Sequence, residues 1–457
     1  MDNLTDKDFV AILQESFGED TAKKVIEALG SDPAVSVRYN PSKPVEIKET
    51  DTVAWSPYGR FLESRPVFTL DPLFHAGCYY VQDSSAMFVG HIARQTFHLF
   101  ENLGRPVRVL DLCAAPGGKT TDLAASLRQA FGGSFILVAN EVMRPRRGVL
   151  ADNVSLWGDP NVLVCSVDPK AFAGLGPFFD IIVADVPCSG EGMFRKDQLA
   201  VQQWSLDTVA LCEARQRRII ADVWPSLCEG GVMVYSTCTF NVRENDGNVR
   251  WIAENLDAEP MSFDINSETF DGVIPTELGF SLVPGMVRGE GQYCAALRKT
   301  SGKPASQIKA RKPAKGSKIQ VPQAESLLGI PVTFSMKGDL VIATPENISA
   351  EASALSVLKP LRTGVAVGTL KGKTLVPDSD IALCSAISED AFPKVDVDRA
   401  TALSYLHRDT IVLPGAPTGF VLVCYQGHPL GFVKNLGNRC NNLHPQDRRI
   451  RMDIDKK

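Results

Sequence analysis

The sequence contains no apolar run that approaches the roughly 20 residues needed to cross a membrane. Its N-terminus, Met1–Asp8, is polar and acidic, so it does not resemble a signal peptide. The chain also has no CxxC or HxxxH pair, and its eleven cysteines are irregularly spaced, which argues against a zinc site and against a disulfide framework. These absences predict a cytoplasmic protein with no bound metal and no membrane partner.

Most of the cysteines fit an interpretation as small, buried hydrophobic residues. We expect this of Cys165, Cys212, Cys228, Cys294 and Cys384. The formal net charge of −5 does not by itself favour nucleic-acid binding, but affinity for phosphate depends more on local basic patches than on the total charge. The length of 457 residues predicts about two to four domains, and we expect a monomer.

Short apolar runs alternate with helical patterns in the middle of the chain. The runs are Val107–Leu112, Phe135–Ala139, Val162–Cys165, Ile181–Ala184 and Val232–Tyr235. Helical stretches such as Thr120–Ala130 and Thr208–Leu227 separate them. Nearly continuous apolar strands between helices are typical of a parallel sheet covered on both faces. The expected fold is therefore α/β with a Rossmann-like core over residues 101–300, in which ligands bind at the carboxyl ends of the strands.

The chain on either side of this core has a different character. Residues 1–100 begin helical, continue with a strand-like segment at Ala34–Asn40, and become helical again near their end. Residues 301–324 form a basic linker, which is either a solvated connector or one that also contacts phosphate. A small mixed region, 325–394, and a β-rich module, 395–457, follow. The module ends in a basic patch made of Arg439, His444, Arg448, Arg449 and Arg451.

The loop after the first core strand can bring the backbone close to a ligand. It runs from Asp111 to Thr120 and contains mostly small residues, and the following helix N-terminus offers free N–H groups to an anion. A phosphate-binding P-loop is excluded because position 113 holds Cys where that motif needs Gly. A tight strand–helix turn in any α/β protein would have a similar sequence.

Acidic residues follow the second and third core strands. Glu141 is placed to accept hydrogen bonds from ribose hydroxyls, and Asp168 can accept one from the exocyclic amine of an adenine. A single acid at a strand end is explained at least as well by a helix cap or a solvated carboxylate. Together with the loop, however, these turns indicate a cofactor that contains adenosine.

Two cysteines follow the fourth and fifth core strands. Cys188 lies in the turn that begins at Asp185, and Cys238 lies in a Ser-Thr-Cys-Thr segment. Adjacent strand ends converge on one cleft, and a Pro-Cys-Ser-Gly turn at an exposed rim suits a buried core cysteine poorly. A thiolate that adds to carbon 6 of a cytosine makes carbon 5 able to attack a methyl sulfonium. Asp185 is placed to hydrogen-bond ring nitrogen 3, and a second cysteine can remove the carbon 5 proton.

These motifs resemble the signature motifs of the Nol/Nop/Sun RNA cytosine-5 methyltransferases. They are Cys113–Lys119, Asp185–Lys196 and Ser236–Thr239. The part Glu191–Lys196 is similar to bacterial enzymes of the ribosomal RNA small-subunit methyltransferase F type. The resemblance covers nearly the whole chain, including Val37–Asn40, Tyr79–Met87 and a C-terminal module that resembles a PUA-like RNA-binding domain.

The resemblance implies a fold, a reaction and a set of site residues. The fold is a class I methyltransferase core with an N-terminal α/β RNA-binding extension and a PUA-like C-terminal domain. The reaction is methylation of carbon 5 of a cytosine in ribosomal or transfer RNA with S-adenosylmethionine. Cys238 is then the nucleophile, Cys188 assists product release, and Lys119 lies near the base with Asp185. The implied cofactor contacts are Cys113, Ala114, Ala115, Pro116, Gly117, Gly118, Lys119, Glu141, Asp168 and Asp185.

Two other functions stay open. DNA cytosine-5 methyltransferases use the Pro-Cys cysteine as nucleophile, and an assay with ribo- and deoxyribo-oligonucleotides separates them from the RNA enzymes. A non-catalytic RNA-binding or ribosome-assembly factor on the same fold has no need to keep Cys188, Cys238, Asp185 and Lys119 together. One position departs from the family, because Leu156 stands where many relatives carry Arg. That departure puts one RNA or structural contact in doubt.

Overall fold

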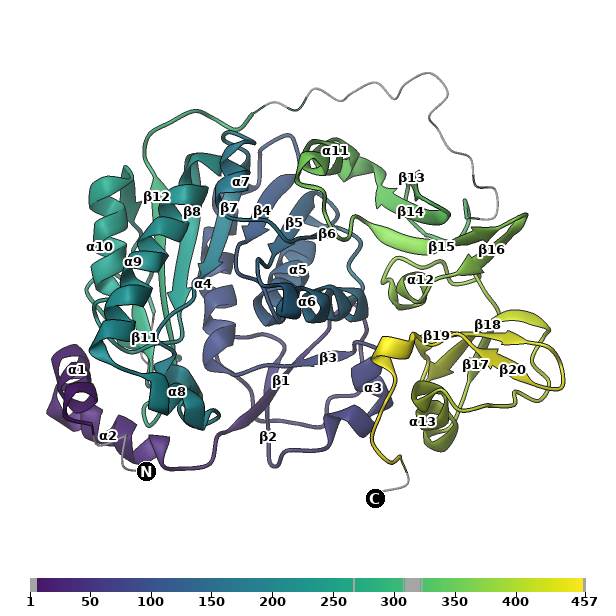
Figure 1. The fold of residues 1–457 in the computed structure, drawn as a ribbon, viewed down its shortest axis with the longest axis horizontal. Coiled ribbons are helices and arrows are strands. Elements are labelled where there is room, and N and C mark those ends of the chain that lie inside the picture. Colours follow the sequence, from purple (N-terminus) through teal and green to yellow (C-terminus); the bar gives the residue numbers. More distant parts are fainter. Residues whose placement is uncertain (1–5, 266–267, 307, 309–320, 322–323, 455–457) are drawn as a thin grey trace.

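A computed structural model describes residues 6–265, 268–306, 308, 321 and 324–454. Within these residues the central element is a nine-stranded sheet in the order β10-β11-β12-β8-β7-β4-β5-β6, with β9 paired to β12 (Figure 1). Five of its strands run parallel and are almost completely buried, which confirms the α/β core predicted from the apolar runs. They are β4 (Val107–Asp111), β5 (Phe135–Asn140), β6 (Val162–Cys165), β7 (Phe179–Asp185) and β8 (Leu227–Thr237).

The sheet continues beyond β8 with antiparallel strands that the apolar runs did not predict. β12 pairs with β8, and Tyr293 lies opposite Thr237 in this register. The strand end that carries Cys238 is therefore flanked by β7 on one side and by β12 on the other. The strands of this edge are β9 (Ala258–Pro260), β10 (Ile274–Pro275), β11 (Phe280–Leu282) and β12 (Gln292–Lys299).

Helices pack on both faces of the sheet, as expected for a parallel core. One hydrophobic cluster joins the sheet to α4, α5 and α6, and a second joins its other face to α7, α9, α10 and α11. The helices are α4 (Phe88–Thr96), α5 (Gly118–Phe131), α6 (Arg144–Trp157), α7 (Lys170–Ala173), α9 (Leu206–Val223), α10 (Asp246–Asn255) and α11 (Ser349–Leu355).

The N-terminal part combines a helical hairpin with a small sheet. Gly18 joins the two helices at φ 80°, a conformation that glycine adopts without strain. Phe9 in the first helix packs against Phe194 and Trp204, so the hairpin lies beside α8 (Figure 1). The elements are α1 (Lys7–Phe17), α2 (Glu19–Leu29), β1 (Val35–Tyr39), β2 (Gly59–Leu62), α3 (Pro72–His75) and β3 (Tyr79–Val81), with α8 at Gln198–Gln203.

The C-terminal part contains two four-stranded sheets that lie side by side (Figure 1). They share one hydrophobic cluster, and the second sheet also packs against Leu70, Ala76 and Cys78 of the N-terminal part. The first holds β13 (Val332–Lys337), β14 (Leu340–Pro345), β15 (Val365–Lys371) and β16 (Thr374–Pro377), followed by α12 (Ser379–Leu383). The second holds β17 (Lys394–Asp396), β18 (Gly419–Tyr425), β19 (His428–Asn435) and β20 (Cys440–Asn442), with α13 (Arg399–His407).

Two further expectations concern the basic linker and membrane-spanning helices. Most of the basic linker predicted over 301–324 lies outside the described residues. Up to Ser306 the chain still lies on the core, where its N–H donates to the Pro177 carbonyl. Across the described part of the chain, no helix is both long and apolar enough to span a membrane.

Candidate active site

The loop after β4 is held by a buried carboxylate. Asp111 is fully buried, and its Oδ2 accepts a hydrogen bond of 2.6 Å from the Thr120 hydroxyl. Its Oδ1 has no protein partner within the described residues. Burial raises the pKa of Asp111 to about 7. The loop reaches α5 through Gly117, whose φ of 114° favours glycine.

The two acids after β5 and β6 differ in their surroundings. Glu141 is buried, accepts the Met143 N–H at 2.7 Å, and lies 3.7 Å from the Arg146 guanidinium. Asp168 is exposed and accepts the N–H of Lys170 at 3.0 Å, where α7 begins. Asp168 thus has the local contact of a helix cap, which leaves its adenine contact a prediction.

Asn140 ties these strand ends together, although it was not selected as a site residue from the sequence. Its amide nitrogen donates to the carbonyls of Leu112 and Val167, and its amide oxygen accepts the Val167 N–H at 3.0 Å. One side chain at the end of β5 therefore links the loop after β4 to the loop after β6. Strand-end polarity is the only signal that pointed to it.

These residues fit a cofactor with ribose hydroxyls and a cationic amino-acid part. The unpartnered Asp111 Oδ1 is a buried acceptor that lacks a donor in the protein. Glu141 is a second buried acid at the neighbouring strand end. Acceptors at successive strand ends of a parallel sheet are the arrangement in which dinucleotides and related cofactors bind.

The two predicted cysteines meet at the ends of β7 and β8. The Sγ atoms of Cys188 and Cys238 lie 3.2 Å apart, and both residues are free thiols of intermediate exposure. The hydrogen bond with Cys238 and burial together raise the pKa of the Cys188 thiol well above its ordinary value.

Asp185 and Lys119 form an ion pair beside the cysteines. The Lys119 ammonium lies 2.9 Å from Asp185 Oδ2, while Oδ1 accepts from the Ser236 hydroxyl at 2.8 Å and from the Gln292 amide at 3.1 Å. Burial alone would lower the pKa of Lys119, but attraction to Asp185, the hydrogen bond with it and weaker attraction to other groups together raise the pKa. The same ammonium attracts the sulfur of Cys238.

Gln292 and Arg38 belong to this region but were not selected from the sequence. The Gln292 amide also donates to the Thr237 carbonyl at 2.9 Å, so it bridges Asp185 and the residue before Cys238. The Arg38 guanidinium, fully buried, donates to the Gly118 carbonyl at 3.1 Å and to the Thr121 hydroxyl. Both contacts join segments far apart in sequence, and no local pattern indicates them.

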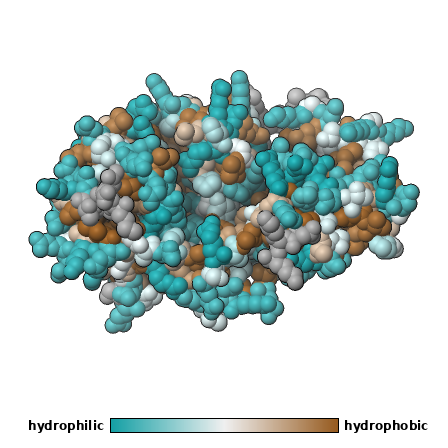
Figure 2. Space-filling model, turned by 60° about the horizontal axis from the view of Figure 1, so that its bottom comes forward, coloured by the Kyte–Doolittle hydropathy of each residue, from teal (hydrophilic) through white to brown (hydrophobic). Residues whose placement is uncertain are grey.

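One face of the molecule is hollowed and largely hydrophilic. The face at the bottom of Figure 1, where α8 lies, has a central hollow bordered largely by hydrophilic side chains (Figure 2).

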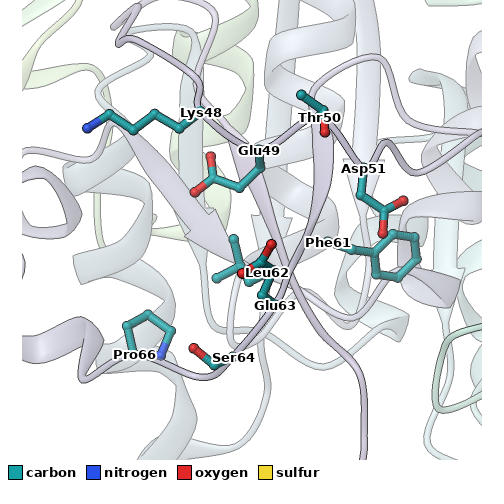
Figure 3. Close-up of a pocket in the computed structure, with 9 residues that line it drawn as sticks. All are labelled: Lys48, Glu49, Thr50, Asp51, Phe61, Leu62, Glu63, Ser64 and Pro66. Carbon is teal, nitrogen blue, oxygen red and sulfur yellow. The ribbon is translucent and has the colours of Figure 1, made fainter.

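A pocket of about 450 Å³ opens elsewhere, around β2 (Figure 3). Carboxylates of Glu49, Asp51 and Glu63 line it. It contains none of the predicted site residues, and its acidity does not suit phosphate.

Two residues of the predicted C-terminal basic patch point inward instead of into solvent. Arg448 bonds Asp152 of α6 at 3.0 Å and lies 3.9 Å from Asp380. His444 is buried, and burial lowers its pKa to about 4, so its imidazole is neutral at neutral pH. A sequence count of basic residues could not separate these inward side chains from the exposed Arg439, Arg449 and Arg451.

No metal centre is present among the described residues, where no group of three or more His, Cys, Asp or Glu side chains could hold an ion. The eleven cysteines are all free, and the five expected to be small core residues are buried.

Family models match three parts of the chain. Residues 102–298 match the family described as 16S rRNA methyltransferase RsmB/F. Residues 6–84 match the N-terminal domain of 16S rRNA methyltransferase RsmF, and residues 392–450 match the methyltransferase RsmF PUA domain. The expected PUA-like module at the C-terminus is therefore confirmed.

Curated proteins with similar sequences are ribosomal RNA methyltransferases by name. The chain is 34% identical to a "Ribosomal RNA small subunit methyltransferase F" of Shewanella baltica over 81% of this chain and 79% of the relative. A protein of that name from Escherichia coli is 32% identical over 81% and 78%.

Two archaeal structures share the fold. A methyltransferase homologue from Pyrococcus horikoshii has a TM-score of 0.52 and 25% identity, and covers 65% of this chain and 98% of its own. NSun6 from the same organism has a TM-score of 0.51 and 18% identity, over 64% and 98%. The chain shares the fold of these two structures. S-adenosylmethionine is the cofactor of the methyltransferase family that residues 102–298 match. It belongs to the ribosomal RNA small-subunit methyltransferase F family.

Proposed function

We propose that this protein methylates carbon 5 of a cytosine in small-subunit ribosomal RNA, with Cys238 as nucleophile and Cys188 as the residue that releases the product. The observation that carries the proposal is the pair of sulfur atoms 3.2 Å apart, beside the ion pair of Lys119 and Asp185. Ribosomal RNA is the substrate named for the relatives, and the matched PUA domain supports RNA as the partner.

The first chemical step needs a thiolate and a polarised base. Cys238 adds to carbon 6, and the electron pair of the 5,6 double bond moves into the ring toward nitrogen 3. Lys119 attracts the Cys238 sulfur, and Cys188 offers it an S–H donor, so both neighbours stabilise a thiolate there. Asp185, fixed by three donors, is oriented to hydrogen-bond the edge of the base.

The second step restores the aromatic ring. S-adenosylmethionine, held near Asp111 and Glu141, would supply an electrophilic methyl group to carbon 5, and would leave as S-adenosylhomocysteine when the bond from its sulfur to that methyl group breaks. Cys238 is then a thioether and no longer accepts the hydrogen bond that is the largest cause of the raised pKa of Cys188. Cys188 can now lose its proton to water and take the proton from carbon 5. The bond between Cys238 and carbon 6 breaks, and Cys238 leaves as a thiolate.

Bisulfite sequencing of total RNA from cells with and without the gene tests the proposal. We expect one or a few cytosines of the small-subunit RNA to lose protection from deamination when the protein is absent. Restoring the wild-type gene should restore protection, and the gene for Cys238→Ala should not. Unchanged protection at every ribosomal cytosine would rule the proposal out, and altered protection in transfer RNA alone would redirect it.

A further inference from the structure

A network of buried polar side chains lies behind the two cysteine loops. Its centre is Glu244, whose carboxylate is completely buried with Gln216 and Asn241. Glu244 Oε2 accepts the Gln216 amide at 2.6 Å, and Oε1 accepts the Asn241 amide at 2.8 Å. None of these residues has a role in the chemistry proposed above. Buried polar groups joined in this way fix the positions of the loops that carry them.

The network holds the backbone on both sides of Cys188. Glu244 Oε2 accepts the N–H of Ser189 at 3.1 Å, immediately after the cysteine. The amide of Gln216 donates to the carbonyl of Pro187 at 3.0 Å, immediately before it. Gln216 and Glu244 also bond each other, so they form one clamp around the peptide groups that flank Cys188.

The hold on the Cys238 loop is less direct. Asn241, three residues after Cys238, reaches Glu244 and the Thr239 hydroxyl at 3.1 Å. The backbone before Cys238 is held separately, because Thr237 is the last residue of β8 and its carbonyl accepts a hydrogen bond from the Gln292 amide. Loss of the clamp therefore frees the Cys188 loop before it frees Cys238.

We propose that Glu244, together with Gln216, is the positioning residue of Cys188, and that this clamp sets the rate of product release without setting the rate of methyl transfer. The inference rests on the function proposed above, in which Cys188 acts only after the methyl group has moved. Displacing a catalytic group by about an ångström can cost as much as 100-fold in the step that it serves. A loosened Cys188 should thus slow elimination and leave the earlier addition and transfer intact.

Two variants test the clamp. Glu244→Gln keeps the volume but replaces one acceptor oxygen with an NH2 group, which then faces other donors. Gln216→Met removes the donor to Pro187. Glu213→Gln is the matched control. Glu213 lies on α9, the helix of Gln216, and its carboxylate pairs with Arg217 and Arg243 and not with the cysteine loops. Each protein is assayed at full length with ribosomal RNA and S-adenosylmethionine, in single-turnover and multiple-turnover conditions. A denaturing gel measures the fraction of protein bonded to RNA.

For both clamp variants we expect multiple-turnover rates to fall roughly 10- to 100-fold, with RNA accumulating on the protein as a covalent adduct. Single-turnover methyl transfer and cofactor affinity by calorimetry should stay near those of wild type. The control should match wild type in every readout.

Two results would overturn the inference while the proposed function stands. One is equal loss of single-turnover and multiple-turnover rates without adduct, which means that the network only maintains the fold. The other is undiminished turnover. If the wild-type protein itself neither methylates cytosine nor forms an adduct with 5-fluorocytosine RNA, the proposed function fails, and the inference fails with it.

Discussion

At the residue scale, the two close sulfurs are proposed to act at different steps of the reaction. The hydrogen bond between them and burial raise the pKa of the Cys188 thiol. We therefore expect Cys188→Ala to methylate once and then to retain the RNA as a covalent adduct. Cys238→Ala and the double variant should form no adduct, since no bond to carbon 6 forms. A denaturing gel with labelled RNA separates these cases.

The same gel can reject the assignment in two ways. Free turnover by Cys188→Ala without a shifted band would make water or another base responsible for elimination. A shifted band with Cys238→Ala would reverse the two roles and match the arrangement in DNA cytosine-5 methyltransferases. Cys212→Ala is a suitable control, because this buried cysteine of α9 lies outside the proposed chemistry.

Asp111 makes a prediction about stability and pH. Burial raises its pKa from 3.8 to about 7, so the folded protein favours the protonated form. The stabilisation that protonated Asp111 contributes is complete below about pH 4, the pKa of this carboxyl in the unfolded chain. It is lost as pH rises through 7. The free energy of unfolding of the cofactor-free protein should thus fall across this range. Asp111→Asn should remove roughly 1 to 4 kcal/mol of that fall.

Urea unfolding at several pH values measures the difference between wild type and Asp111→Asn. Other buried acids, such as Glu244 with a pKa raised to about 7 by burial, are common to both proteins and cancel in the difference. Parallel stability curves for the two proteins between pH 4 and 7 would show that Asp111 has no raised pKa in the fold.

At the scale of elements, the first turn of α5 is fixed from outside the core. Arg38 of β1 reaches the Gly118 carbonyl and the Thr121 hydroxyl, and its guanidinium lies 4.6 Å from the Trp157 ring. Arg38→Met should loosen this turn and the loop after β4 that precedes it. We expect affinity for S-adenosylmethionine to fall about tenfold and unfolding to occur several degrees lower, since buried hydrogen bonds of a charged group contribute about 1.5 to 3 kcal/mol.

Calorimetry and thermal unfolding measure these two effects. Arg60→Met is the control, because Arg60 lies on β2 of the same small sheet and bonds only nearby carbonyls of Pro57 and Gly59. Equal cofactor affinity in Arg38→Met and wild type would mean that the N-terminal sheet does not support the cofactor loop.

Elements with a strong local signal were predictable from the sequence, and elements defined by distant partners were not. The parallel strands were predicted because each is a buried apolar run, and the meeting of Cys188 and Cys238 followed because β7 and β8 are neighbours. The edge strand β12 was not predicted, so the bond of Gln292 to Asp185 was not either. Asn140, Arg38 and Glu244 were missed for the same reason, because their contacts depend on how distant segments pack.

At the scale of the whole molecule, the C-terminal part, which contains the two four-stranded sheets, is joined to the rest by packing and by ion pairs. Residues Leu70, Ala76 and Cys78 belong to its hydrophobic cluster, although they lie in the N-terminal part of the chain. The segment that leads into β15 of the first C-terminal sheet contacts β6 through a bridge between Val164 and Arg362. Such contacts hold an RNA-binding module at a fixed distance from the catalytic core, which would restrict the RNA positions that can reach the cysteines.

The C-terminal arginines should therefore separate into two functional groups. Arg439, Arg449 and Arg451 are exposed, and replacing all three with Ala should weaken RNA binding and flatten its dependence on salt, because phosphate contacts release counterions. Arg448 is bonded to Asp152 and lies near Asp380, so Arg448→Ala should instead lower the unfolding temperature and leave the salt dependence unchanged.

Filter binding at several salt concentrations and thermal unfolding distinguish the two variants. Cofactor affinity should stay at the wild-type value in the triple variant, since the replaced charges lie in the C-terminal module and not on the strand ends that we propose hold the cofactor. An Arg448→Ala protein that unfolds normally but loses salt-dependent RNA binding would place Arg448 on the RNA surface. The ion pair with Asp152 would then be only one of two arrangements, exchanged for phosphate when RNA binds, and the C-terminal domain would move when the substrate arrives.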